Sequence, residues 1–223
     1  MKYKAIIFDM DGTIIDTEHI WKRASFVMLE RRGIMLSEEQ HAEIAKELHG
    51  LALTHCCLYL KMRGFFVEEV EDLAREKRQI AHELFEKEVR FMNGFLDFFK
   101  KVQQHELKTA IATNAEHETV QVTNKALNLE NLFGQHVYHL EHVNRQGKPH
   151  PAIYLHASSK LEIEPEFCIA IEDSPRGIQS AKKAGMFCIG FNSAGNREAL
   201  SEADIVIDMY EEVDLAQLLQ RKK

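Results

Sequence analysis

The sequence predicts an α/β fold: a doubly wound, Rossmann-like parallel sheet with a block of α-helices inserted after its first strand. Several short apolar runs end in polar or turn residues, as buried parallel strands do. Helical stretches separate the later runs, and this alternation favours parallel strands with helices on both faces of the sheet. A long helical stretch without proline follows the first run, which indicates the insertion.

The expected elements follow from these runs in chain order. Strands are expected at residues 4–10, 108–113, 136–140, 167–171, 187–191 and 203–207. Helices that cover the sheet are expected at residues 94–104, 116–127, 152–160 and 175–184. For the last of these helices, Ser174 is the expected N-cap and Pro175 the expected first residue.

The insertion is expected to span residues 16–90. Gly33, Gly50 and Gly64 interrupt it at similar intervals, which predicts about four helices joined by short turns. A length of 223 residues fits one domain with such an insert. The predicted organisation is an α/β core of residues 1–15 and 91–223, with a helical domain of residues 16–90 between the two parts.

Composition and charge disfavour several kinds of protein. With 45% hydrophobic and 28% charged residues, the chain is expected to form a packed core in water. The net charge of −7 argues against a nucleic-acid partner, because binding phosphates needs clustered Lys and Arg. No membrane partner is expected, because no apolar run reaches the roughly 18 residues of a membrane helix. We therefore expect a cytoplasmic protein, and the four cysteines show no CxxC spacing that would indicate a disulfide or metal framework.

Two carboxylates follow the first predicted strand. In doubly wound sheets, ligands bind beyond the carboxyl ends of the strands. Asp9 and Asp11 are two residues apart, so their side chains project to the same side if the strand extends that far. Oxygen ligands of this kind suit Mg²⁺, and Gly12 permits a sharp turn that brings backbone N–H groups toward an anion. The alternative is an Asp-Gly turn with solvated carboxylates.

Candidate phosphate ligands occur in two later segments. Thr113 and Asn114 end the second predicted strand, where a hydroxyl and a helix N-terminus can hold a phosphate oxygen. Thr113 also fits a capping box with Glu116, and both roles can coexist. Lys148 lies in a proline-rich loop, where it either supplies a positive charge to an anionic substrate or remains a solvated surface residue.

A second acidic pair, Glu172 and Asp173, follows the strand predicted at residues 167–171. Two carboxylates at the end of a buried strand are costly unless a cation compensates them, and a divalent metal would do so. The residues alone support a structural role for this pair equally well. In that interpretation, acidic residues before a helix are stabilised by its dipole, and Ser174 caps the helix.

Taken together, these segments resemble the haloacid dehalogenase superfamily, in the subgroup with a helical cap, over nearly the whole chain. That family has an Asp-x-Asp-Gly-Thr/Val motif, then a Thr or Ser, then a Lys, and then an acidic pair. This chain supplies, in the same order, Asp9–Met10–Asp11–Gly12–Thr13, Thr113, Lys148 and Glu172–Asp173. Each motif alone is weak or moderate, whereas the ordered set with an insertion is highly specific.

The resemblance implies a phosphatase that hydrolyses a small phosphate monoester, with a sugar or sugar-alcohol phosphate as the expected substrate. It implies Asp9 as the nucleophile that becomes an aspartyl-phosphate, and Asp11 as the general acid and base. A Mg²⁺ cofactor is expected on Asp9, Asp11, Asp173 and Glu172. Phosphate-binding residues are expected to be Thr113, Asn114 and Lys148. A monomer or weak dimer is expected.

Four alternatives occur on the same fold: three other activities and an inactive module. Dehalogenases and phosphonatases of this superfamily lack an acid at the position of Asp11, which disfavours both. A β-phosphoglucomutase-like mutase shares the core motifs, but this chain has Leu53 in place of a cap Arg and Trp21 in place of a His. A second phosphate is therefore expected to lack a cationic partner in the cap. An inactive binding or regulatory module is the fourth alternative, and the intact acids argue against it.

Substrate choice is expected to depend on the helical cap. The candidate substrate-contacting residues there are Glu18, His19, Trp21, His49 and Gly50. Asp16 is a candidate N-cap of the first cap helix.

Three histidines in the core, His136, His139 and His142, recur at every third residue. Their strand-like context predicts that they share no face. No transition-metal site is therefore expected there.

Overall fold

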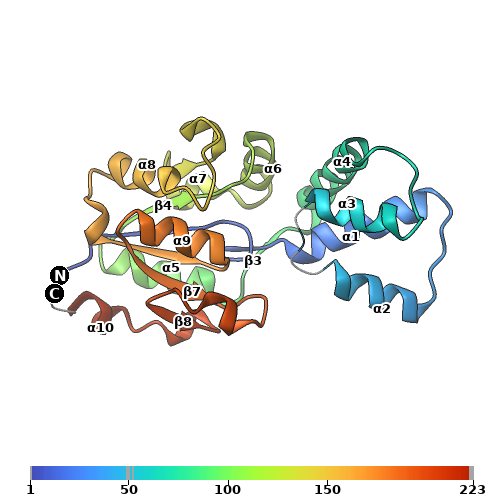
Figure 1. Ribbon diagram of the computed structural model, residues 1–223. Coiled ribbons are helices and arrows are strands. Elements are labelled where there is room, and N and C mark those ends of the chain that lie inside the picture. The colour runs from blue at the N-terminus through green and yellow to red at the C-terminus, as the bar shows by residue number, and fades with distance from the viewer. Residues whose placement is uncertain (1, 49–50, 52, 221–223) are drawn as a thin grey trace. The chain divides into compact units, whose positions relative to one another are not determined.

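The computed structural model describes residues 2–48, 51 and 53–220, and the chain forms two compact units (Figure 1). The core unit comprises Met1–Asp16 and Arg90–Lys223, and the helical unit comprises Thr17–Val89. The helical unit is therefore inserted between the first strand of the core unit and its remaining strands. None of the helices in the described part of the chain has the length and apolar character of a transmembrane span.

Six parallel strands form the sheet of the core unit, in the order β5-β4-β1-β6-β7-β8. Their bounds are β1 Ala5–Phe8, β4 Lys108–Ala112, β5 Val137–Tyr138, β6 Cys168–Glu172, β7 Phe187–Phe191 and β8 Ile205–Ile207. Because β1 pairs with β4 on one side and with β6 on the other, the direction of winding reverses around β1. Ligands bind at this kind of switch point. The predicted fold class, a doubly wound parallel sheet, is confirmed.

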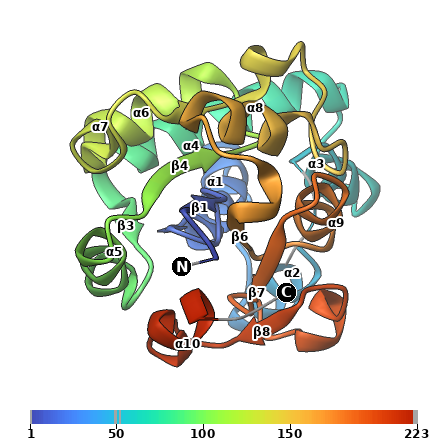
Figure 2. The same ribbon diagram turned by 90° about the vertical axis from the view of Figure 1, so that its left-hand side faces the viewer.

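Helices cover both faces of the sheet (Figure 2). On one face, α8 (Ala152–Leu161) and α9 (Pro175–Lys183) bury small and branched residues of the central strands. On the other face, the ring of Phe8 contacts four aromatic rings from α5 (Phe95–Gln104) and α7 (Leu129–Phe133), with centroids 5.7 to 6.3 Å apart. The remaining helices are α6 His117–Leu127, α10 Leu215–Gln220, η1 Leu140–Val143, η2 Pro165–Phe167, η3 Arg197–Leu200 and η4 Tyr210–Glu212.

Four helices make up the described part of the helical unit. They are α1 Glu18–Arg31, α2 Glu38–Glu47, α3 Leu53–Met62 and α4 Val70–Glu88. The long helix α4 packs against both α1 and α3, and Ile20, Leu29, Ile80 and Phe85 are fully buried there. Apolar side chains at helical spacing thus give this unit its own hydrophobic core.

The two chain segments that join the units are paired with each other. β2 (Ile15–Asp16) and β3 (Arg90–Phe91) form a short antiparallel ladder. The carboxylate of Asp16 pairs with the guanidinium of Arg90, with Oδ2 and Nη2 2.7 Å apart. The expectation that Asp16 caps the first cap helix is therefore wrong: Thr17 precedes α1, and Asp16 belongs to β2.

Of the predicted strands that are shorter in the structure, the first and third lose the most residues. The first ends at Phe8 rather than at residue 10, because the chain turns at once: the N–H groups of Ile14 and Ile15 both donate to the carbonyl of Met10. The strand predicted at residues 136–140 is reduced to β5, and the 3-10 helix η1 follows it. The predicted cap of α9 is confirmed, since Ser174 Oγ accepts from the N–H of Gly177 and Pro175 begins the helix.

Candidate active site

The predicted site residues of the core unit lie at or near the carboxyl ends of three neighbouring strands. Asp9 directly follows β1, Glu172 ends β6 and Asp173 follows it, and Thr113 follows β4. Lys148 comes from the loop before α8. Because β4, β1 and β6 are parallel and adjacent, their carboxyl ends lie at the same edge of the sheet, at the switch point.

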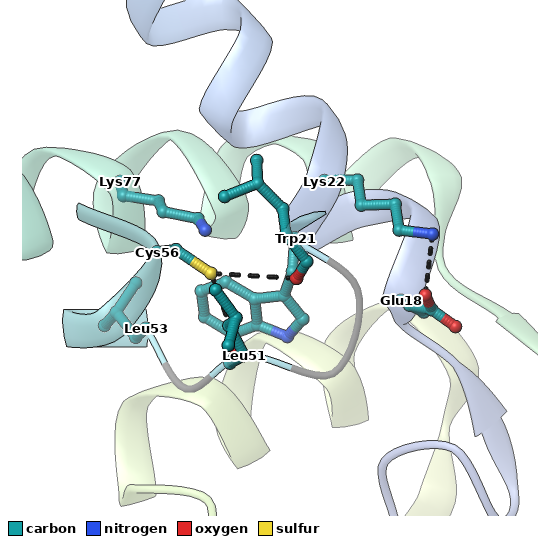
Figure 3. Close-up of a pocket in the computed structure, with 8 residues that line it drawn as sticks. Glu18, Trp21, Lys22, Leu51, Leu53, Cys56 and Lys77 are labelled. Atoms are coloured by element: carbon teal, nitrogen blue, oxygen red, sulfur yellow. Dashed lines mark hydrogen bonds and ion pairs between the residues drawn. The ribbon is translucent and has the colours of Figure 1, made fainter. Parts of the chain in front are cut away.

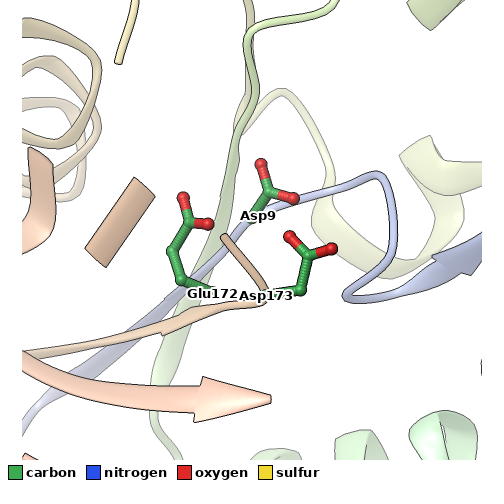
Figure 4. Close-up of side chains that lie close together, drawn as sticks. All are labelled: Asp9, Glu172 and Asp173. Carbon is green, nitrogen blue, oxygen red and sulfur yellow. The ribbon is translucent and has the colours of Figure 1, made fainter. Parts of the chain in front are cut away.

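Three carboxylates from two of these strands form a compact acidic cluster. One carboxylate oxygen from each of Asp9, Glu172 and Asp173 lies within 4.8 Å of the other two (Figure 4). Asp9 and Glu172 are buried and Asp173 is half-buried. Buried carboxylates repel one another, and this donor set of closely spaced oxygens suits a hard divalent cation such as Mg²⁺.

Lys148 carries the positive charge of this cluster. Its ammonium forms ion pairs with Asp9 Oδ1 and, at 2.6 Å, with Glu172 Oε1. Its side chain is only 4% exposed, so these ion pairs are largely shielded from water. Burial lowers the pKa of Lys148, but the two carboxylates outweigh it and raise the pKa above its ordinary value. Lys148 is therefore a fixed cation at neutral pH.

Burial also shifts the pKa values of two of the carboxyls, in the direction that favours their neutral forms. Burial raises the pKa of Asp9 to about 7, and the charges of Glu172 and Asp11 add to the shift while Lys148 opposes it. Burial and the neighbouring acids also raise the pKa of Asp173 well above its ordinary value. One ammonium thus leaves the negative charge of the cluster undercompensated. A bound divalent cation would remove this imbalance, so the residues present fit a metal.

Both oxygens of Glu172 already have protein donors. Oε1 accepts a hydrogen bond from the Tyr154 hydroxyl at 2.7 Å in addition to the Lys148 ion pair. Oε2 accepts from the Ser174 hydroxyl at 3.3 Å. These contacts tie Glu172 to Lys148, to Tyr154 of α8 and to Ser174 at the start of α9.

Two glycines make room for the carboxylates. A Cβ at Gly12 would lie 2.1 Å from Asp173 Oδ2, and Gly12 has a φ of +76°, a backbone conformation that favours glycine. A Cβ at Gly177 would lie 1.9 Å from the carboxylate of Glu172. The acidic cluster therefore depends on the absence of side chains at both positions.

Asp11 lies in the turn beyond β1 rather than on the strand. It forms an isolated bridge with Ile15 and is half-buried. Since the strand ends at Phe8, the alternation of strand side chains does not place Asp9 and Asp11 on one side. The turn brings Asp11 near enough to Asp9 for its charge to contribute to the raised pKa of that residue.

Thr113 and Asn114 have structural partners in this loop. Thr113 is buried, and its hydroxyl accepts from the N–H of Ala115 at 2.9 Å. The expected capping box of Thr113 and Glu116 is wrong, because α6 begins at His117 and Glu116 occupies the N-cap position. Asn114 Oδ1 accepts from the backbone N–H of Lys148 at 2.9 Å, so Asn114 holds the loop that carries the ammonium.

Two further residues help to hold Lys148 in place through its carboxylate partner and its backbone. They were not predicted from the sequence. Tyr154 donates to Glu172, and Arg176 Nη2 donates to the carbonyl of Lys148 at 3.0 Å. Neither residue belongs to a motif, and their partners are distant in the chain. Only the packing of α8 and α9 on the sheet brings them together.

The helical unit contains a pocket of about 340 Å³ (Figure 3). Of the predicted cap residues, Trp21 and Glu18 line it, whereas His19 is not among its lining residues. His49 and Gly50 lie outside the described residues. Glu18 forms an ion pair with Lys22 at 2.7 Å, and the Trp21 ring contacts the edge of Phe85. The pocket is completed by Leu48, Leu51, Leu53, Cys56 and Lys77.

Lys77 is the pocket residue that sequence reasoning missed. It is only 2% exposed and lines the pocket from α4 together with Lys22 from α1. A buried lysine is uncommon without an anionic partner. The pocket thus contains cationic side chains, although Leu53 stands at the position compared with a cap Arg. Lys77 could not be recognised from the sequence, because it lies in a highly charged segment in which most charged side chains are expected to face water.

The histidines at every third residue also differ from the prediction. His139 is extended but η1 begins directly after it, so the rings of His139 and His142 lie 4.0 Å apart. The prediction that the three histidines share no face is therefore wrong for His139 and His142, because the 3-10 turn that begins directly after His139 brings the ring of His142 back beside it.

Comparisons with known proteins show the family of the chain and its similar structures. The family model described as haloacid dehalogenase-like hydrolase matches residues 6–191. Validoxylamine A 7'-phosphate phosphatase of Streptomyces hygroscopicus subsp. limoneus is 28% identical over 95% of this chain and 96% of its own. Phosphorylated carbohydrates phosphatase of Thermotoga maritima is 29% identical over 91% and 92%. The solved structure of a putative beta-phosphoglucomutase from Thermotoga maritima has a TM-score of 0.79 at 26% identity, over 98% of this chain and 100% of that one.

Proposed function

Because the chain belongs to the haloacid dehalogenase-like hydrolase family, we propose that it is a Mg²⁺-dependent phosphatase that hydrolyses a small phosphorylated metabolite through an aspartyl-phosphate. The observation that carries the proposal is the convergence of Asp9, Lys148 and Asp173 beside the ends of β1 and β6. Phosphoryl transfer depends mainly on positioning and on neutralising charge, and this arrangement provides both.

In the proposed reaction, Asp9 attacks phosphorus. A bond forms between an Asp9 carboxylate oxygen and phosphorus while the bond to the leaving alkoxide breaks, and Asp11 protonates that oxygen. Asp11 then takes a proton from the water that attacks the aspartyl-phosphate, which releases phosphate and restores Asp9. Lys148 lies against Asp9, so its ammonium offsets the charge of the incoming phosphate dianion. Thr113 would bind an oxygen of the same group.

We propose that Asp9, Asp173 and the backbone carbonyl of Asp11 hold the metal. A bound Mg²⁺ would supply the positive charge that lets a dianionic phosphate approach the carboxylate of Asp9. For Glu172 the contacts support a different role from the one expected: its oxygens bind Lys148, Tyr154 and Ser174. Glu172 is proposed to position Lys148.

We propose a sugar or sugar-alcohol phosphate as the substrate, with the helical unit acting as the cap that selects it. The names of the two phosphatase relatives refer to phosphorylated carbohydrates and to a validoxylamine phosphate, which supports this class. The pocket in the helical unit combines an aromatic wall at Trp21 with charged groups at Glu18 and Lys77. Such a combination suits a polar ligand with an apolar ring face.

A phosphosugar mutase is the second candidate, and Lys77 is the observation that favours it. A mutase must hold a second phosphate, and Lys77 gives the cap pocket a cation even though Leu53 stands where a cap Arg is expected. Hydrolysis remains the preferred activity because both curated relatives above are named phosphatases.

The test is an assay of phosphate release from an aryl phosphate and from a panel of sugar phosphates and polyol phosphates. We expect release that requires Mg²⁺, stops with a chelator and is lost in Asp9→Asn. Full turnover by Asp9→Asn would exclude the covalent mechanism. A mutase would instead interconvert a hexose 1-phosphate and 6-phosphate in the presence of a bisphosphate, with little phosphate released.

A further inference from the structure

A pair of histidines at the start of α6 and the start of η1 has the geometry of a metal site. His117 Nδ1 and His139 Nε2 are 3.2 Å apart. With metal–nitrogen bonds of about 2.0 to 2.1 Å, two ligands at this separation subtend roughly 100° at a shared ion, close to the tetrahedral value. The two ring centroids are only 5.0 Å apart. If the two nitrogens pointed straight at each other, the centroids would be farther apart than this. The rings therefore meet at an angle, and both nitrogens can face a common point beside the line that joins them.

The second nitrogen of His139 is already fixed by a carboxylate. His139 Nδ1 is 2.6 Å from Glu141 Oε2. Donation of its N–H to that oxygen makes Nε2 the acceptor of a hydrogen bond from His117 Nδ1, and a cation that replaced the shared proton would bind both nitrogens through their lone pairs. Metal-binding histidines commonly donate their other N–H to a carboxylate, which sets the tautomer and the ring orientation. His139 is also buried, at 8% exposure, so its orientation is defined before any ion binds.

The surroundings allow an ion to enter and to keep further ligands. His117 is exposed, and both histidines line a pocket of about 550 Å³ in the core unit, together with His142, Asn124 and Glu130. Within the described residues, the acidic cluster is the only group of three or more His, Cys, Asp or Glu residues whose ligand atoms lie this close together. The remaining positions would thus be open to water or to a small ligand.

We propose that His117 and His139 bind a divalent transition-metal ion, in the class of Cu²⁺, Ni²⁺ and Zn²⁺, at a site that shares no residue with the acidic cluster. Imidazole nitrogens suit these ions, whereas Mg²⁺ prefers oxygen ligands. Among them Cu²⁺ binds most tightly to a given nitrogen site. The bound ion would connect α6, which follows Thr113, to η1, which precedes Lys148, so it would also stabilise the folded core unit.

Titration of tag-free protein with Cu²⁺ tests the proposal, with excess Mg²⁺ present to occupy the acidic cluster. The readout is the electron paramagnetic resonance spectrum, in which nitrogen couplings identify imidazole ligands. We expect one tight equivalent with nitrogen couplings from the wild type and a rise in its melting temperature. We expect at least about tenfold weaker binding and fewer nitrogen couplings in His117→Asn, whose exposed position leaves folding unaffected.

His139→Asn is the second variant, and His55→Asn is the matched control, since His55 is exposed on α3 of the helical unit. We expect His139→Asn to behave like His117→Asn, and His55→Asn to bind like the wild type. Phosphatase activity with Mg²⁺ should be unchanged in His117→Asn and His55→Asn, which separates this proposal from the proposed function. Equal Cu²⁺ affinity and equal nitrogen couplings in the wild type and His117→Asn would overturn it.

Discussion

Glu172 and Asp173 are neighbours in the chain but have different contacts, and we propose different roles for them. Glu172 is held by Lys148, Tyr154 and Ser174, whereas the carboxylate of Asp173 lies against Gly12 and, at 3.4 Å, the hydroxyl of Ser193. A positioning residue and a metal ligand respond differently to loss of charge. Loss of charge at a positioning residue should lower turnover at saturating metal. Loss of charge at a metal ligand should raise the metal concentration needed for activity.

Glu172→Gln and Asp173→Asn therefore form a matched pair of conservative variants. For Glu172→Gln we expect kcat/KM to fall about 10- to 100-fold, with the Mg²⁺ concentration for half-maximal activity unchanged. For Asp173→Asn we expect that Mg²⁺ concentration to rise at least about tenfold. Steady-state kinetics over a Mg²⁺ series measure both. A similar rise in both variants would show that Glu172 is itself a metal ligand.

The raised pKa of Asp9 predicts how the stability of the metal-free protein depends on pH. Burial raises this pKa from 3.8 to about 7, so the folded state binds the proton more tightly than the unfolded chain does. The stabilising contribution is complete below pH 3.8 and is lost as the pH rises through about 7. Between pH 5 and 8 the free energy of unfolding should thus fall by up to about 3 kcal/mol more in the wild type than in Asp9→Asn.

Urea denaturation in a chelator at several pH values measures this difference. Asp9→Asn serves as the reference because every other titrating group is retained. Excess Mg²⁺ should diminish the pH dependence of the wild type, since a bound cation lowers the pKa of the carboxyls around it. Parallel curves for the wild type and the variant in the chelator would contradict a raised pKa at Asp9.

At the scale of elements, the turn after β1 is the segment on which the acidic cluster depends. Gly12→Ala introduces a Cβ where Asp173 Oδ2 now lies, and it forces alanine into a positive φ of +76°. Gly185→Ala is the matched control: its φ is +86°, but nothing lies within 4 Å of the added Cβ. Both variants should lose about 1 kcal/mol of stability from the backbone strain, and only Gly12→Ala should lose phosphatase activity. Thermal denaturation and phosphate release measure the two effects, and an active Gly12→Ala enzyme would contradict this role for the turn.

The elements also show what the sequence could and could not predict. The strands with continuous apolar runs were predicted to within about two residues, because a buried parallel strand has no polar face to obscure its ends. Thr113 was predicted to cap α6, but a longer turn separates it from that helix. Asp16 was predicted to cap α1, but pairing with Arg90 places it in β2. Both errors concern polar residues with several possible hydrogen-bond partners.

The same distinction applies to the site. Asp9, Lys148 and the Glu172–Asp173 pair were identified from motifs because each follows a strand or lies in a loop at the sheet edge. Tyr154 and Arg176 could not be identified in this way. Their contacts join residues that are 18 and 28 positions apart, and the packing of two helices on the sheet decides them.

For the whole molecule, we propose that the core unit carries out the chemistry and that the helical unit selects the substrate. Lys77→Met keeps the length of the side chain and removes its charge from the pocket. We expect kcat/KM for the preferred sugar phosphate to fall at least about tenfold, with little change for a small aryl phosphate. Lys61→Met, at an exposed pair with Glu69 in the same unit, should affect neither substrate. If kcat/KM fell equally for both substrates in Lys77→Met, the lysine would act in the reaction common to both and not in the choice of substrate.

The central claim is that Asp9 receives the phosphoryl group from the substrate. It is tested most directly by acid quenching the enzyme during turnover with Mg²⁺ and locating the modification by peptide mass spectrometry. We predict the mass of one phosphoryl group on the peptide that contains Asp9, sensitive to hydroxylamine and absent from Asp9→Asn. A phosphoryl group on any other residue, or undiminished turnover by Asp9→Asn, would contradict the account.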